Sequence, residues 1–182
     1  MKYLFLFALL VGNLPTQAQT FADYLAQFPA ITSAKTWQDT EIAALPISGK
    51  KLDMQYFSFL PNTTYSSSGK GVYPLGKIES GSTVTVFVAA PSTGYRADYN
   101  TQISVDTHSY NKKTGKPLRI STNFYLFSVG GDPETKTFMY TGKLETDGKT
   151  WVKVYQTGTG SAIKKQQAYK VSNKGLTFDK EF

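Results

Sequence analysis

TVTVFVA, residues 83–89, alternates between two kinds of side chain with the two-residue period of a β-strand. Its three valines share one face, while its two threonines and Phe87 share the other. The valine face predicts an apolar core. Because the other face mixes polar side chains with an aromatic ring, we do not expect it simply to face water.

A second run repeats this pattern further along the chain. Val152 and Val154 form one face, and Trp151, Lys153 and Tyr155 form the other. Such a sheet either packs on a second sheet, or curls into a barrel, or is partly covered by helices. Of these arrangements we favour a curled or barrel-like meander.

Runs rich in Val, Thr, Tyr and Phe recur with Gly, Asn, Asp and Pro between them, which predicts about nine strands. We expect them at 51–59, 71–78, 82–90, 101–110, 119–129, 135–144, 150–157, 166–172 and 175–182. Turn residues at 111–116, 130–134, 147–148 and 173–175 predict tight hairpins. Strands joined so closely are antiparallel neighbours. The predicted fold is therefore mainly all-β, an antiparallel up-and-down meander.

The segment before these strands has a helical pattern. FADYLAQF, residues 21–28, places apolar residues at the i, i+3, i+4 and i+7 positions of one helical face. Thr20 is placed to cap this helix, and Pro29 ends it. A second helical stretch is expected over 37–45, stopped by Pro46.

The first 18 residues have the pattern of a secretory signal peptide: a positive start at Lys2, an apolar run over 3–11, a break at Pro15 and a small residue at Ala18. The apolar run is too short to span a bilayer. We therefore expect a signal peptide at 1–18, an N-terminal helical segment at 19–46 and an antiparallel β domain at 47–182. The chain is expected to be exported to the periplasm or beyond, without a membrane span.

The composition argues against several classes of site. The chain has no cysteine and one histidine, which argues against disulfide frameworks, zinc sites, cysteine nucleophiles and a bacterial lipid anchor. GVYPLGKI, residues 71–78, has the glycines and lysine of a phosphate loop but lacks the following Ser or Thr and helix. We expect no cofactor and no metal.

The single histidine, His108, shares a strand face with Asp106. A carboxylate can orient a histidine base, but no GxSxG nucleophile motif accompanies the pair. The ordinary placements of such a histidine are the surface or a local hydrogen bond. Two close carboxylate pairs, Asp132 with Glu134 and Glu145 with Asp147, fall in predicted turns, so a hydrolase based on two carboxylates stays an alternative that depends on distant residues meeting in a cleft.

The chain carries a formal net charge of +7, which favours anionic partners. Nearly all its cations are lysines, with arginine only at 96 and 119, so a nucleic acid is not the expected partner. The densest basic region lies on the last hairpin. Its lysines are the candidate electrostatic contact: Lys164, Lys165, Lys170 and Lys174.

Tyrosines in or beside the loops of the first half form a second candidate binding site, since exposed rings stack on sugars or anchor protein partners. These residues are Tyr56, Tyr65, Tyr73, Tyr95, Tyr99 and Tyr110.

Four features in order resemble small exported β-meander proteins of Gram-negative bacteria: FADYLAQFP after the signal peptide, PISG, YPLGKI before a valine-rich strand, and a lysine-rich final hairpin. The resemblance implies secretion and one β-rich domain, and it assigns no functional residue. We expect an exported, non-enzymatic binding protein that holds a glycan or a protein. The alternatives are a periplasmic inhibitor or immunity-type protein and a carboxylate-based hydrolase.

Overall fold

The computed structural model describes residues 19–61, 71–93, 101–129, 140–158 and 164–182. Within them the chain is mostly β, with two antiparallel sheets and short helices near the N-terminus. The predicted antiparallel all-β fold is confirmed. The sheets do not close into a barrel, because they stack as two layers with a shared apolar core.

The first sheet has the order β2-β3-β4-β5, an uninterrupted meander. Its strands are β2 (Tyr73–Ser80), β3 (Thr83–Thr93), β4 (Thr101–Asn111) and β5 (Pro117–Val129). All four agree closely with predicted runs.

The second sheet has the order β1-β6-β7-β8-β9, a second meander with one early strand added at its edge. Its strands are β1 (Lys35–Gln38), β6 (Tyr140–Thr146), β7 (Trp151–Gly158), β8 (Lys164–Ser172) and β9 (Gly175–Glu181). The predicted pairing across 130–134 is wrong, because β5 and β6 belong to different sheets. The residues between them, 130–139, lie outside the described part of the chain.

The other predicted turns do join paired strands. Asp147 accepts hydrogen bonds through Oδ1 from the backbone N–H groups of Lys149 and Thr150, both at 2.8 Å, and so closes the β6–β7 turn. Gly148 has φ of +79°, a left-handed conformation that favours glycine. Asn173 and Lys174 alone separate β8 from β9.

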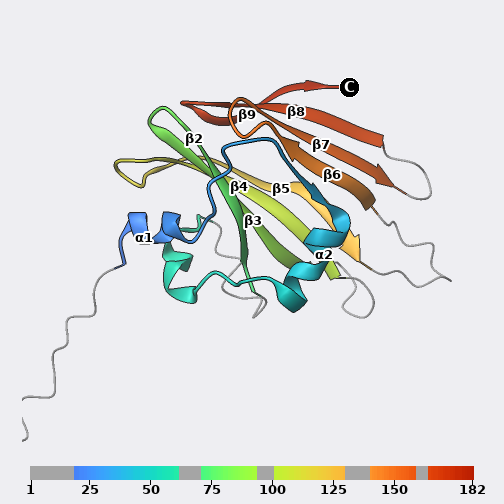
Figure 1. The fold of residues 1–182 in the computed structure, drawn as a ribbon, viewed down its shortest axis with the longest axis horizontal. Coiled ribbons are helices and arrows are strands. Elements are labelled where there is room, and N and C mark those ends of the chain that lie inside the picture. Colours follow the sequence, from blue (N-terminus) through green and yellow to red (C-terminus); the bar gives the residue numbers. More distant parts are fainter. Residues whose placement is uncertain (1–18, 62–70, 94–100, 130–139, 159–163) are drawn as a thin grey trace, which may run out of the picture.

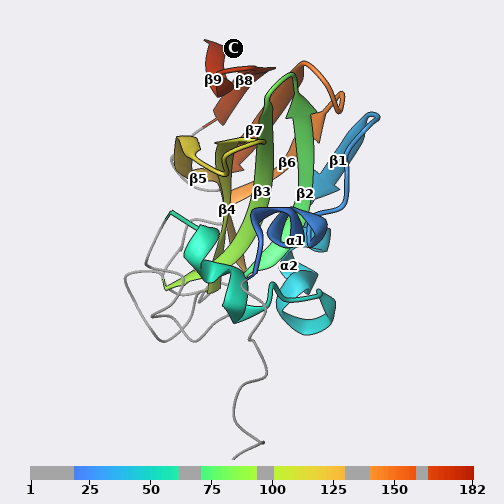
Figure 2. The same ribbon diagram turned by 90° about the vertical axis from the view of Figure 1, so that its left-hand side faces the viewer.

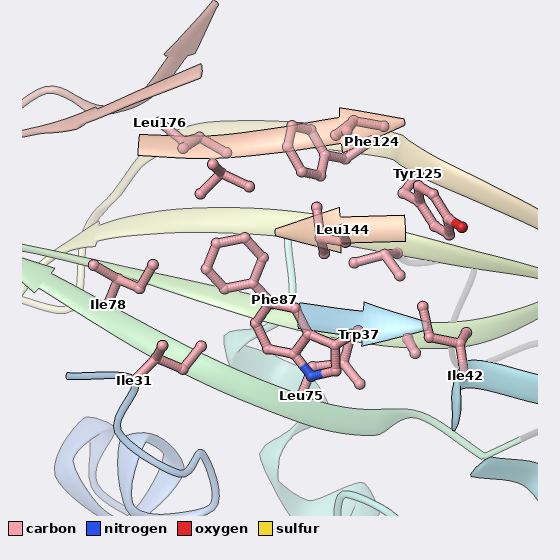
Figure 3. Packing of buried hydrophobic residues seen from close by; sticks show 14 of the residues in the cluster. Ile31, Trp37, Ile42, Leu75, Ile78, Phe87, Phe124, Tyr125, Leu144 and Leu176 are labelled. Carbon is pink, nitrogen blue, oxygen red and sulfur yellow. The ribbon is translucent and has the colours of Figure 1, made fainter. Parts of the chain in front are cut away.

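The main core lies between the two sheets (Figure 3). Phe87 of the first sheet is fully buried there, with its ring centroid 6.0 Å from that of Trp37 on β1. Leu144 and Val152 of the second sheet are also fully buried in this cluster. The predicted faces of β3 and β7 are thus correct. Phe87 points toward the second sheet, and the two valines of β7 point toward the first sheet.

The valine face of β3 is covered by helices, so the first sheet is buried on both faces. Two short helical elements, α1 (Phe21–Ala26) and η1 (Met54–Phe59), lie on the opposite side of this sheet from β6–β9 (Figure 1). The residues of this second core are Tyr24, Phe28, Leu52, Tyr56, Leu60, Val72, Val84, Val86, Val88, Ala90 and Tyr110. Thr20 caps α1 as predicted, accepting a hydrogen bond from the Asp23 N–H at 3.1 Å.

Three expectations for the early segment are wrong. Residues 51–59 were expected as a strand but contain η1, a 3-10 helix capped by the Asp53 side chain. Trp37 lies in β1, so the second helix begins only after it, as α2 (Asp39–Ser48). Pro46 does not stop α2, which continues to Ser48, and the Gly49 N–H closes its last turn on the Leu45 carbonyl.

The start of α2 links the two sheets. The Asp39 carboxylate accepts hydrogen bonds from the Tyr125 hydroxyl on β5 and from the Gly142 N–H on β6. Burial raises the pKa of Asp39, and the same surroundings raise the pKa of Tyr125, first by burial and then through Asp39 itself. One carboxylate therefore holds a strand of each layer.

Candidate functional site

The tyrosines expected at an exposed binding site are partly in the core. Tyr56 and Tyr110 are buried beneath the helices, and Tyr73 is buried between the sheets. The expectation that these three are exposed is wrong, because both faces of the first sheet are covered. Tyr65, Tyr95 and Tyr99 lie outside the described residues.

His108 is fully buried on β4, on the face that the helices cover. Its ring lies edge-on to that of Tyr110, with centroids 6.4 Å apart. Burial lowers the pKa of His108 to about 4, so the imidazole is neutral at pH 7. The surface position, one of two ordinary placements expected for it, is wrong.

The lysines of the last hairpin lie along β8 and its turn. Lys165, Lys170 and Lys174 are exposed. Lys164 begins β8, and its side chain lies outside the described set. Of the four, Lys170 borders the hollow described next, and its ammonium forms an ion pair with Asp179 at 2.7 Å.

The outer face of the second sheet carries a hollow of about 520 Å³. Residues of β7, β8 and β9 line it. These three strands lie at the end of the molecule away from α1 (Figure 2). We call this hollow the C-terminal groove. Its outward side chains are Trp151, Lys153, Ala168, Lys170, Lys180 and Phe182, with Asp179 at its border.

Strand register explains the shape of the C-terminal groove. Lys153, Ala168 and Lys180 stand opposite one another on β7, β8 and β9. Side chains in one such row point to the same side of the sheet. The short Ala168, 6% exposed, therefore forms a floor between two long lysines, while Trp151 and Phe182 line the same hollow.

A β-bulge in β9 places Lys180 and Phe182 on the outer face of the second sheet. In the β8–β9 ladder Tyr169 pairs with Phe178 and Ala168 pairs with Lys180, which leaves Asp179 as the extra residue. Without this irregularity, alternation from the buried Leu176 would turn Lys180 to the inner face. The bulge thus brings Lys180, and Phe182 after it, beside Trp151 and Lys153.

Aromatic rings hold the central lysines in place. The Lys153 ammonium lies 5.0 Å from the Trp151 ring centroid and 5.9 Å from that of Phe182. The Lys180 ammonium lies 4.7 Å from the Phe182 ring. Each such cation–π contact is worth about 0.5–1 kcal/mol at an exposed site, which restricts the lysine without neutralising it.

The charges of this face are distributed unevenly. Glu145 pairs with Lys143 at 2.6 Å, and Asp179 pairs with Lys170, so both carboxylates are occupied at the margins. Within the part of the chain that the structure describes, neither Lys153 nor Lys180 has an ion-pair partner. The centre of the groove therefore holds two ammonium groups that form no ion pair with the described residues, although Glu145 lies directly opposite Lys153 in the β6–β7 ladder.

Two ammonium groups beside aromatic rings are suited to bind a ligand that carries both a negative charge and an apolar surface. Among the described residues that line the groove, Asp179 is the single carboxylate, so a two-carboxylate hydrolytic mechanism has no pair of acids here. The described residues contain no group of three or more His, Cys, Asp or Glu side chains that could hold a metal ion. In the same parts of the chain, no helix is long and apolar enough to cross a membrane.

Comparisons with family models, with curated proteins and with solved structures found no match. The resemblance to small exported β-meander proteins stays a prediction from the sequence. The C-terminal groove is therefore the feature from which a function is inferred.

The sequence pattern named one groove residue, Lys170, as a candidate contact and gave Trp151 and Lys153 no binding role. The mixed face of Trp151, Lys153 and Tyr155 was visible from alternation, and Lys170 from its basic neighbours. Lys180 and Phe182 were missed because regular alternation in β9 assigns them to the core face. No glycine or proline marks the bulge, and one aspartate within a predicted strand, Asp179, does not specify a bulge by itself.

Proposed function

We propose that this protein is an exported, non-enzymatic binding protein that holds an acidic glycan in the C-terminal groove. The observation that carries the proposal is the pair Lys153 and Lys180 over the Ala168 floor, between the Trp151 and Phe182 rings. Ammonium groups attract the carboxylate or sulfate of an acidic sugar, and aromatic rings pack against its apolar face.

Ring-bound lysines favour a fitted site over a diffuse positive surface. A lysine side chain loses considerable rotamer entropy when a ligand fixes it, and here the ring contacts offset part of that loss before ligand binding. The groove volume lies within the range of small-ligand sites. Export is supported by the signal-peptide pattern of residues 1–18, and acidic glycans are found outside cells.

The test is binding of the full chain, as its expression host secretes it, to polygalacturonate, heparin and neutral dextran. Mass spectrometry of the secreted protein reads its N-terminus, which we expect at Gln19. Isothermal titration at about 50 and 300 mM salt separates screened attraction from a fitted site. We expect binding of at least one acidic glycan that persists at the higher salt, and no binding of dextran.

Two sets of variants locate the site. The double variant Lys153→Gln and Lys180→Gln is expected to weaken binding tenfold or more, since two charged contacts are lost. The control, Lys113→Gln with Lys116→Gln, removes the same charge from the exposed β4–β5 turn and is expected to bind like the parent. Equal weakening by both double variants, or no weakening by the first, would refute the site.

A filled groove provides an independent check. Ala168→Leu adds bulk to the floor while both lysines stay, so a fitted ligand is excluded but long-range attraction is unchanged. We expect loss of the binding that survives high salt. If an acidic protein is captured instead, and glycans are not, the partner class in this proposal is wrong.

A further inference from the structure

We propose that the ligand is a linear polyanionic glycan chain that runs along β7, with a second contact site at Tyr155 and Lys143 beyond the C-terminal groove. This inference rests on the proposed function, and it specifies the length and direction of the bound chain. Its basis is the sequence of outward side chains on β7 and the lysine beside its far end.

Three outward residues of β7 form a regular series of ring, cation and ring. Trp151, Lys153 and Tyr155 are alternate residues on one face, and all three are half-buried. Alternate residues of a strand are about 6.6 Å apart, so Trp151 and Tyr155 are separated by about 13 Å. That span is longer than one sugar ring, which cannot therefore contact both aromatic side chains.

The far end of this series repeats the chemistry of the groove. The Lys143 ammonium lies 4.8 Å from the Tyr155 ring centroid, and the two residues are directly opposite in the β6–β7 ladder. A ring with a lysine over it thus occurs at both ends of β7, Trp151 with Lys153 and Tyr155 with Lys143. An acidic unit seated between Lys153 and Lys180 can continue toward Tyr155, where a second acidic unit competes with the Glu145 carboxylate for the Lys143 ammonium.

The place of β7 in the sheet favours a glycan over an acidic peptide. An extended peptide gains most from pairing with the backbone of an edge strand. Here β7 lies between β6 and β8, so its backbone groups are already paired on both sides. Only side chains are available to a ligand, and rings alternating with cations match repeating sugar rings and acidic groups.

The test is a length series. Galacturonate oligomers of one, two, four and six units, and heparin oligomers of four and eight units, are titrated calorimetrically into the full secreted chain. In at least one series we expect affinity to rise tenfold or more between the shortest and longest members. Tyr155→Ala is expected to remove most of that gain while leaving the shortest binding member unchanged, and Tyr155→Phe is expected to retain it.

The outcomes separate this inference from the proposed function. Affinity independent of length in both series, or equal loss for short and long oligomers in Tyr155→Ala, overturns the extended site and leaves the groove intact. Absence of binding at every length overturns both. Poly-glutamate of matched charge serves as the peptide control. If its affinity rises with chain length as much as that of the glycans, the choice of a glycan is overturned.

Discussion

Acidification should destabilise the protein through one residue, His108. The ring is fully buried, and burial lowers its pKa from 6.5 to about 4. Between these two values the unfolded chain binds a proton that the folded protein does not. Stability therefore rises with pH across this window and is lost as pH falls from 6.5 toward 4. One pKa unit corresponds to about 1.4 kcal/mol, so the loss from this residue is about 3 kcal/mol.

Two measurements check this value. Because His108 is the single histidine of the chain, its ring protons give one NMR titration curve. Urea unfolding of the parent and of His108→Gln at several pH values gives the stability difference, in which the titration of carboxylates distant from residue 108 largely cancels. We expect the parent to lose about 3 kcal/mol relative to the variant between pH 7 and pH 4. A folded-state histidine titrating near 6.5, or a constant difference, would refute the reasoning.

Two other substitutions test the architecture. Tyr125→Phe removes one of the two donors to the Asp39 carboxylate, and we expect a loss of about 1–3 kcal/mol in the free energy of unfolding, measured by urea denaturation. An unchanged midpoint would show that this link between the sheets contributes nothing. Gly148→Ala forces a side chain into a left-handed conformation, with its Cβ 2.7 Å from the Ser33 backbone, and we expect a loss above about 1 kcal/mol in thermal unfolding. Parental stability there would mean that the β6–β7 turn relaxes freely.

The strands of this protein were predictable because their signals are local. Alternation identified β3 and β7 with the correct faces, and turn residues identified the hairpins that follow Asn111, Asp147 and Asn173. The division of the strands between two sheets was not predictable, because it depends on where the chain leaves one layer for the other, after Val129. Nothing in the strands themselves encodes that change.

The candidate binding residues were also not predictable from local sequence, because their exposure depends on how the layers pack. Burial of Tyr56 and Tyr73 follows from helices packing on one face of the first sheet and the second sheet packing on the other, which no tyrosine signals in its own neighbourhood. Residues 51–59 were assigned to a strand on their aromatic content, yet the Asp53 cap favours a helical turn. Trp151 and Phe182 line the same groove from segments that are distant in the sequence, which is visible only in the folded protein.

The bulge in β9 also bears on how this surface changes during evolution. Because the bulge already absorbs Asp179, deleting that residue would restore regular pairing and leave Lys180 and Phe182 facing outward. The deletion would at the same time remove the carboxylate that neutralises Lys170. Gain or loss of a single codon can thus adjust the charge of the groove by one unit, without altering any side chain in either core.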